Sequence, residues 1–285
     1  MNNEKNKNKW VEKCVDTLKL SGRSERTIIN YKSAWNRFLN YFDEDTNIKN
    51  LDNNKIVDYF KDMLISKNVC ADYYNLNVCA IRYFYSVCFE IELNRKLLPT
   101  TKLRKRIPTI LEKDIFLKIF NDDKHLNHKC WLILAFCCGL RVDEVATLKI
   151  EDIISSEHKL KVLGKGNKER YTILPDIVIK FLRLYYKDKC ITKRTGYLFE
   201  GIDNKEHVNP KTITNYFTSL KEKYNLNDNV VFHSLRHAFA TYYLMNGGDI
   251  LALKSMLGHK SIQSTIIYLH LAQDFNNLKG INYHG

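Results

Sequence analysis

The sequence lacks the marks of a zinc-binding or membrane-spanning protein. Its cysteines form no Cys-x-x-Cys pair and have no histidine partners at the spacing of a zinc site. No secretory apolar segment opens the chain, and the longest apolar run, Trp131–Cys138, is far too short to cross a bilayer. These absences predict a cytoplasmic protein with no bound metal and no membrane contact.

Cysteine itself is not scarce, and the interpretation we favour for it is a set of buried free thiols in a reducing compartment. His125 and His128 would supply half of a metal site, but they lack partners, so we interpret both as surface residues. The cysteines that lie in apolar or aromatic runs are Cys70, Cys79, Cys88, Cys137 and Cys138.

Positive charge is in excess, since 45 Lys and Arg against 32 Asp and Glu give a formal net charge of +13. The excess is divided almost evenly between residues 1–105 and 106–285, so neither half is a basic tail on a neutral domain. Such a surface suits a protein that surrounds a polyanion. Compositional drift in an AT-rich genome is the alternative explanation.

Residues 10–89 have the spacing of helices only. After Ser24, which we expect to cap a helix, apolar residues recur at three- and four-residue steps through Trp35 to Phe42. Further helices are expected over residues 54–65 and 71–89, the second with an aromatic stripe. Such stripes form core more often than base-stacking platforms, so we interpret these aromatics as packing residues.

A basic linker is predicted over residues 93–107, which hold Pro99 and have no helical period. Its last part contains Arg104, Lys105 and Arg106, which are candidate contacts to a phosphate backbone. The linker would separate a helical domain over residues 1–92 from a larger domain over residues 108–285.

The larger domain has a mixed pattern. Strands are expected over residues 159–163 and 170–174, joined by a glycine-containing turn. Helices are expected over residues 176–186, 212–224, 233–244 and 250–257. The sequence therefore predicts a mainly α protein with a small β-sheet or hairpin.

Residues with the chemistry to attack a phosphodiester are spread along this second domain. Arginines can grip the charged non-bridging oxygens, histidines can donate hydrogen bonds or take up a proton, and a lysine can protonate the leaving oxygen. A tyrosine can act as the nucleophile. The residues are Arg141, Lys165, His233, Arg236, His259 and Tyr268.

The motifs around these residues resemble the tyrosine recombinase (phage integrase) family over nearly the whole chain. The family pattern of Arg, Lys, His-x-x-Arg, His or Trp, and Tyr is filled in order, and the contexts Gly139-Leu-Arg-x-x-Glu144 and Leu257-Gly-His259 match as well. The resemblance implies a helical core-binding (SAM-like) domain followed by a mixed α/β catalytic domain. No extra arm-binding domain is recognised, which is typical of Xer-like or mobile-element recombinases.

The resemblance also implies roles. Arg141 and Arg236 would hold the scissile phosphate, with His233 as base or orienting group and His259 as hydrogen-bond donor. Lys165, on the turn between the strands, would protonate the leaving 5′-oxygen. Tyr268 would be the nucleophile, although Tyr243 or Tyr283 would serve chemically just as well.

Neighbouring residues receive supporting interpretations. Glu144 lies on the same helical face as Arg141 and either orients it or forms a surface salt bridge. Lys168 and Arg170 are candidate DNA-backbone contacts or plain surface residues. We interpret His237 and His270, which flank the site, as structural.

These roles predict a site-specific recombinase that acts on double-stranded DNA through a 3′-phosphotyrosyl intermediate and needs neither ATP nor a metal cofactor. The family implies four protomers on paired sites, and the tail after Tyr268 either docks into a neighbouring protomer or folds back. One alternative is a nicking and closing enzyme like the type IB topoisomerases. The other is a non-catalytic DNA-binding regulator, which would bind DNA without forming a covalent product.

Overall fold

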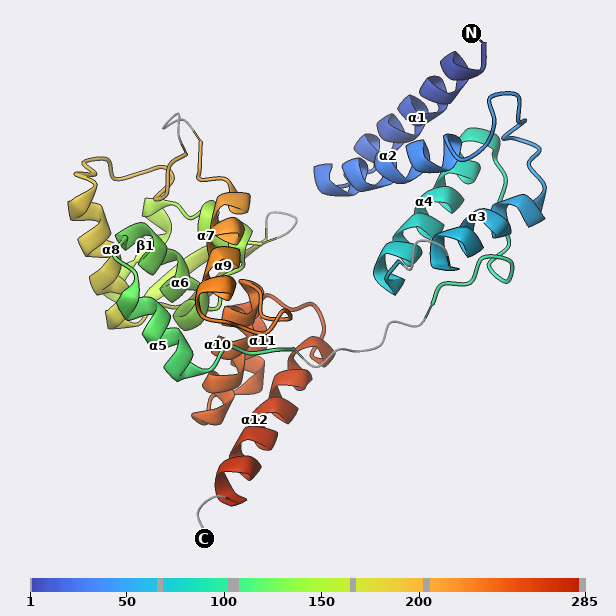
Figure 1. The fold of residues 1–285 in the computed structure, drawn as a ribbon. Helices are drawn as coiled ribbons and strands as arrows, with labels where there is room; N and C mark the ends of the chain where they lie inside the picture. The colour runs from blue at the N-terminus through green and yellow to red at the C-terminus, as the bar shows by residue number, and fades with distance from the viewer. Residues whose placement is uncertain (1, 66–68, 102–107, 165–167, 202–205, 282–285) are drawn as a thin grey trace. The chain divides into compact units, whose positions relative to one another are not determined.

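The computed structural model describes residues 2–65, 69–101, 108–164, 168–201 and 206–281. The chain divides into two compact units, Met1–Lys105 and Arg106–Gly285 (Figure 1). The basic run at the end of the expected linker lies outside the described residues, so the boundaries at 92, 93, 107 and 108 remain a prediction.

The first unit is helical, as expected: α1 (Asn2–Leu20), α2 (Glu25–Leu39), α3 (Asn53–Ile65) and α4 (Ala71–Phe89). The Ser24 side chain accepts a hydrogen bond from the Thr27 backbone N–H, which confirms the predicted cap of α2. The helix ends at Leu39 rather than Phe42, because the Tyr41 backbone N–H bonds the Phe38 carbonyl three residues back and so leaves the α-helical pattern. Phe42 therefore packs from the following turn.

Aromatic side chains form the core of this unit, which confirms their interpretation as packing residues. Trp35 is fully buried, and its indole N–H donates to the Ala80 carbonyl at 2.7 Å. Buried Tyr85 donates to the Ile48 carbonyl at 2.8 Å. The polar ends of these rings are thus satisfied inside an apolar cluster, as burial requires.

The cysteine interpretation is only partly right. Cys138 is buried and Cys88 and Cys137 are half-buried, but Cys70 and Cys79 are exposed. Cys70 directly precedes α4, and Cys79 lies on the face of α4 opposite the core, so an apolar sequence neighbourhood did not determine burial. All the cysteines are free thiols.

The second unit packs its helices around α6, whose residues Cys130–Ala135 are buried on consecutive positions. The apolar run at this place in the sequence is therefore a central helix. Its end at Gly139 has a positive φ of 70°, and a side chain there would meet the Phe239 ring. The helices of this unit are α5 (Lys113–Asp122), α6 (Leu126–Cys138), α7 (Val142–Ala146), α8 (Asp176–Asp188), α9 (Pro210–Lys223), α10 (His233–Met245), α11 (Ile250–Leu257) and α12 (Gln263–Ile281).

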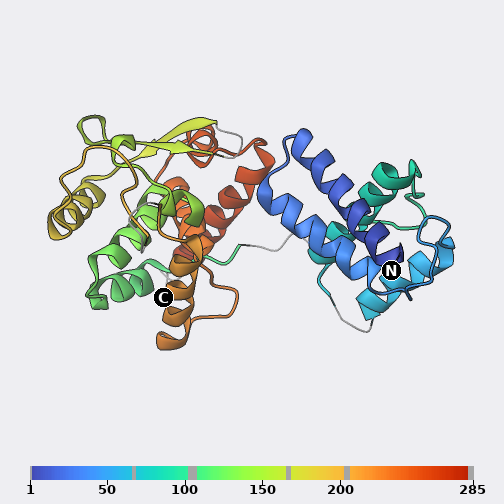
Figure 2. The same cartoon turned by 90° about the horizontal axis from the view of Figure 1, so that it is seen from above.

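An antiparallel sheet of order β1-β2-β3 lies along one edge of this unit (Figure 2). The predicted hairpin is confirmed as β2 (Lys159–Leu163) and β3 (Glu169–Ile173), and the sequence pattern missed the short β1 (Ile153–Ile154). On β3, Arg170 and Thr172 are buried while their neighbours are exposed. Because side chains alternate along a strand, these two polar residues face the interior.

The expected fold class, mainly α with a small sheet, is confirmed. Among the described residues, no helix is both long enough and apolar enough to cross a membrane. Within the same ranges, no three His, Cys, Asp or Glu side chains gather as metal ligands would.

Candidate active site

Arg141 and Arg236 meet at the carboxyl end of α11, although they are far apart in the sequence. Arg141 directly precedes α7, and Arg236 lies in the first turn of α10. Arg236 donates to the Leu257 carbonyl at 2.5 Å and to the Gly139 carbonyl at 2.6 Å, and Arg141 donates to Leu257 at 3.4 Å. The partial negative charge of a helix carboxyl end favours cations at this place.

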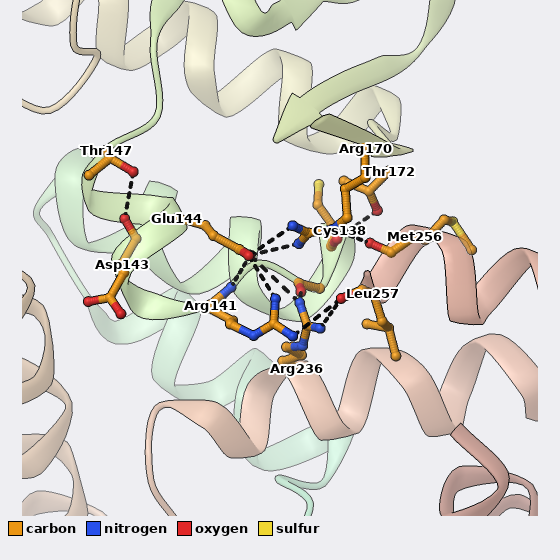
Figure 3. Close-up of polar contacts among 11 residues, drawn as sticks. Cys138, Arg141, Asp143, Glu144, Thr147, Arg170, Thr172, Arg236, Met256 and Leu257 are labelled. Carbon is orange, nitrogen blue, oxygen red and sulfur yellow. Dashed lines mark hydrogen bonds and ion pairs between the residues drawn. The ribbon is translucent and has the colours of Figure 1, made fainter. Parts of the chain in front are cut away.

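Glu144 is the anion that holds this cluster together (Figure 3). Its carboxylate accepts from the Arg141 backbone N–H and from the Arg141 guanidinium, both at 2.8 Å. Arg236 lies 3.7 Å away. With 8% of its surface exposed, Glu144 is an interior residue, so the surface salt bridge considered from the sequence is wrong.

The charge of Glu144 persists despite burial. Burial alone would raise its pKa, but hydrogen bonds and charge from Arg170, the Arg141 backbone N–H and the charge of Arg236 lower the pKa to about 2. A buried carboxylate facing several guanidiniums is stabilised only while it stays ionised.

Arg170 is the third guanidinium on Glu144, with bonds of 2.9 and 2.7 Å to the two carboxylate oxygens. A further bond of 2.7 Å runs to the Met256 carbonyl. Because Arg170 is only 9% exposed and bound on both sides, its expected place on the surface is wrong. The local sequence pointed the other way, because the apolar residues of β3, Tyr171 and Ile173, are the exposed ones.

Arg141 and Arg236 differ in their access to solvent. The side chain of Arg141 is 37% exposed, whereas Arg236 has no exposed surface. Among the described residues nothing accepts a hydrogen bond from the buried Nε of Arg236. Burial and the neighbouring Arg141 lower the pKa of Arg236 to about 9, which still leaves it charged at neutral pH. The pair thus combines one accessible guanidinium with one unused buried donor.

Tyr268 lies in α12 and is 3% exposed. Its hydroxyl is 2.8 Å from Nδ1 of His237 in α10. Burial raises the pKa of Tyr268, and the charges of Arg236 and Arg141 oppose that rise. Tyr243 packs against Phe239 instead, and Tyr283 lies outside the described residues.

Two imidazoles, those of His237 and His259, contact the tyrosine, and that of His233 lies against His237. His259 contacts the Thr265 hydroxyl at 3.0 Å, and its ring stacks on that of Tyr268 with centroids 6.2 Å apart. The ring of His233, which is open to solvent on one side, meets that of His237 edge to face at 4.5 Å.

The surroundings of these histidines favour the neutral form. Partial burial, followed by the charges of Arg236 and Arg141, lowers the pKa of His233 and of His259 to about 4. Burial and the other histidines lower the pKa of His237 to about 3. Each ring therefore carries one N–H donor and one nitrogen lone pair that can accept at neutral pH.

His237 is the residue that the sequence reading left as structural and that the structure places on the tyrosine hydroxyl. The signal was present, because His233 and His237 are four residues apart and such residues share one face of a helix. Exposed His270, the other flanking histidine, lies on α12.

Of the remaining candidates, Lys168 is exposed and directly precedes β3. Lys165, Arg104, Lys105 and Arg106 lie outside the described residues. The described site thus contains a two-arginine cluster with its carboxylate, a buried tyrosine and three neutral histidines. That set can bind an anion and can activate a hydroxyl.

Comparison with known proteins gives a consistent picture. Residues 109–274 match the model described as the phage integrase family, and residues 10–95 match the phage integrase N-terminal SAM-like domain. The chain is 28% identical to the tyrosine recombinase XerD of Staphylococcus epidermidis over 93% of this chain and 95% of that protein. It is 30% identical to XerD of Staphylococcus saprophyticus over 69% of this chain and 70% of that protein.

Solved structures share the fold. A lambda integrase (75–356) dimer bound to a COC′ core site is 19% identical, with a TM-score of 0.71 over 92% of this chain and 94% of that one. The Tn1549 transposon integrase in complex with transposon right end DNA is 16% identical, with a TM-score of 0.67 over 91% and 94%. At these identities the likeness concerns the architecture alone.

Proposed function

Because this chain belongs to the phage integrase family and is a site-specific DNA recombinase of the tyrosine type, we propose that Tyr268 cuts DNA by attacking a backbone phosphate. The product would be a 3′-phosphotyrosyl link and a free 5′-hydroxyl. Attack by the 5′-hydroxyl of a partner duplex would then rejoin the strands. The covalent link conserves the phosphodiester energy, so the reaction needs neither ATP nor a metal.

The observation that carries this proposal is the Arg141–Arg236 pair beside a buried tyrosine. Arg141 offers an accessible guanidinium, and Arg236 offers a buried Nε–H without a partner among the described residues. Two forked donors of this kind match the two non-bridging oxygens of a phosphodiester. Their charge would be worth most as the transition state gathers negative charge on those oxygens.

The remaining residues take supporting roles. His259 and His233 would hydrogen-bond the phosphate, and Lys165 would protonate the leaving 5′-oxygen. Glu144 and Arg170 would hold the arginine pair in place from behind, so Arg170 would act by positioning rather than by touching DNA. Lys168 would contact the DNA backbone, as would the linker residues Arg104, Lys105 and Arg106.

We further propose double-stranded DNA as the partner and the cytoplasm as the compartment. Residues 1–92 would bind DNA as the core-binding domain, residues 93–107 would link the domains along the backbone, and residues 108–285 would carry the catalysis. Four protomers would assemble on paired sites, with the segment after Tyr268 docking into a neighbouring protomer.

Covalent trapping tests the proposal. The probe is a duplex carrying a paired inverted repeat identified in the DNA beside the gene, with a nick beside the cleavage position so that the cut fragment diffuses away. The wild-type protein should form a DNA adduct that survives denaturing electrophoresis, and Tyr268→Phe should form none. Tyr243→Phe is the matched control, because it also removes one hydroxyl from a ring of the same unit, and it should trap DNA like the wild type.

The same experiment separates the alternatives. A nicking and closing enzyme would form the adduct and relax supercoiled plasmid but would exchange no strands between two duplexes. A non-catalytic regulator would shift the duplex in a native gel and form no adduct at all. An adduct that persists in Tyr268→Phe would mean that the nucleophile is another residue.

A further inference from the structure

One contact in the site has no role in the mechanism described so far. The hydroxyl of Tyr268 is hydrogen-bonded to Nδ1 of His237 at 2.8 Å, across the packed helices α10 and α12. We propose that His237 is a further catalytic residue, which accepts the phenolic proton of Tyr268 as the tyrosine attacks the phosphate. This inference rests on the proposed function of Tyr268 as the nucleophile.

Because solvent has little access to the Tyr268 hydroxyl, a protein group is favoured over water as the proton acceptor. Tyr268 is 3% exposed, so bulk water has almost no contact with the residue. A general base must lie within hydrogen-bond reach of the proton that it removes, and the observed distance meets that requirement. His237 is moreover half-buried on a helix, which fixes its place better than a loop would.

The direction of the hydrogen bond follows from the two ionisation states. Burial raises the pKa of Tyr268, so the phenol carries its proton, and burial lowers the pKa of His237 to about 3, so the imidazole is neutral. A neutral imidazole with its proton on Nε2 presents a lone pair at Nδ1. Tyr268 then donates to His237, and the proton already lies on the path that attack requires.

The substrate itself supplies the missing basicity. In the free protein the groups that face His237 and Tyr268 are cations and neutral rings. The cations are Arg236 on α10 and Arg141 before α7, and the rings are His233 on α10 and His259 after α11. A phosphodiester bound between Arg141 and Arg236 would bring a negative charge to this cluster. An anion nearby favours the protonated imidazole, so DNA binding raises the proton affinity of His237.

The other two imidazoles fit this task less well. Nδ1 of His259 contacts the Thr265 hydroxyl, and its ring lies nearly parallel to the tyrosine ring, with centroids 6.2 Å apart. His233 is the more solvent-exposed ring and meets His237 at its edge. Both keep the phosphate-binding roles already proposed.

The step balances without any other reactant. The Tyr268 O–H bond breaks and its proton forms the Nδ1–H bond of His237, while the oxygen pair forms the bond to phosphorus. The bond from phosphorus to the 5′-oxygen breaks, and that oxygen takes a proton from Lys165. On rejoining, His237 returns its proton to the departing phenolate.

Two substitutions separate holding the hydroxyl from accepting its proton. His237→Asn places an amide near the position of Nδ1, so a hydrogen bond to Tyr268 remains but no proton can be accepted at neutral pH. His237→Ala removes both. His270→Ala is the matched control, since it removes an exposed histidine from the same helix as Tyr268.

The measurement is the rate of covalent adduct formation on the nicked duplex described above, with a native gel shift on the same duplex as the binding control. Loss of general base catalysis should slow both His237 variants by about 100-fold or more, with little change in binding. His270→Ala should react at the wild-type rate. The slow rate of both variants should recover as the pH rises, because Tyr268 then loses its proton before it attacks and no longer needs a base.

A second readout tests the chemistry directly. Replacing Tyr268 with 3-fluorotyrosine lowers the pKa of the phenol, so the need for a base falls, and the His237 variants should regain much of their rate. Wild-type rates in His237→Asn would overturn the inference. So would a slow rate that neither alkaline pH nor fluorotyrosine restores, because His237 would then only position the ring. If the unaltered protein forms no adduct, the proposed function fails instead.

Discussion

At the scale of the residue, Glu144 is the side chain on which the site depends. It accepts hydrogen bonds from Arg141 and Arg170 and lies 3.7 Å from Arg236, and of these residues only Arg141 is accessible to solvent. Like charges packed this closely repel unless an anion stands among them. Glu144 therefore sets the geometry of the Arg141 and Arg236 guanidiniums, which we propose to hold the DNA phosphate.

Replacing Glu144 with Gln should destabilise the protein by about 3 kcal/mol, because it leaves buried guanidiniums without their anion. Chemical denaturation of the wild type and the variant measures the difference. Glu157→Gln is the control, since Glu157 pairs with Lys159 at an exposed position where the cost should stay below about 1 kcal/mol. Equal effects of the two substitutions would contradict the account.

The histidines predict how stability depends on pH. His233, His237 and His259 have folded-state pKa values lowered from 6.5 to about 4, about 3 and about 4. Below pH 6.5 the unfolded chain therefore binds protons that the folded chain does not, so the free energy of unfolding should rise with pH across this window.

Denaturation between pH 6.5 and about 5, where most carboxylates are still ionised, isolates this contribution. The wild type should lose stability as the pH falls, and His237→Asn should show a shallower slope. A slope that is unchanged in the variant would show that His237 is not held neutral.

At the scale of the element, the site is built where helices end. The carboxyl end of α11 offers the Met256 carbonyl to Arg170 and the Leu257 carbonyl to Arg236. Gly258 ends this helix with a φ of +65°, and a Cβ there would lie 2.9 Å from Cδ of Arg170. The glycine thus closes the helix and leaves room for the guanidinium.

Gly258→Ala should therefore cost more than Gly247→Ala. Both positions have positive φ, which costs an alanine about 1 kcal/mol, but nothing lies within 4 Å of a Cβ at Gly247. Only the change at Gly258 should also push Arg170 off Glu144 and slow adduct formation several-fold. Trapping rates and unfolding midpoints of the two variants check this, and similar trapping rates would count against a role for Arg170.

The sequence predicts the features that depend on residues close together in the chain, and it misses those that depend on contacts between distant segments. The helices, the hairpin and the cap at Ser24 rest on local periodicity and spacing, and the structure confirms them. The inward orientation of Arg170 and the contact between His237 and Tyr268 join segments far apart in the chain. A polar residue in a local pattern reads as surface, so burial of Arg170 became visible only through its partners Glu144 and Met256.

At the scale of the whole molecule, the charge of +13 is distributed over both units rather than concentrated in one. Binding to DNA should therefore be strongly salt-dependent, since each phosphate contact releases counterions. Lys168 is exposed and can reach a phosphate, whereas Arg170, two residues further on, is buried and cannot.

Lys168→Ala should weaken binding to any duplex and lower the salt slope by about one unit, because it would remove the phosphate contact that we propose for Lys168. Arg170→Lys keeps the charge but loses the forked contact with Glu144, so it should leave the salt slope unchanged and reduce stability. Equilibrium binding at several salt concentrations measures both. An unchanged slope for Lys168→Ala would place that residue away from the DNA.

The identity of the nucleophile is the claim on which the others depend. Trypsin would release residues 261–279 as one peptide in which Tyr268 is the only tyrosine. After trapping on the nicked duplex and nuclease digestion, mass spectrometry should find a nucleotide 3′-phosphate on Tyr268 within this peptide. A nucleotide on a different residue, or a covalent adduct in which this peptide is unmodified, would contradict the account.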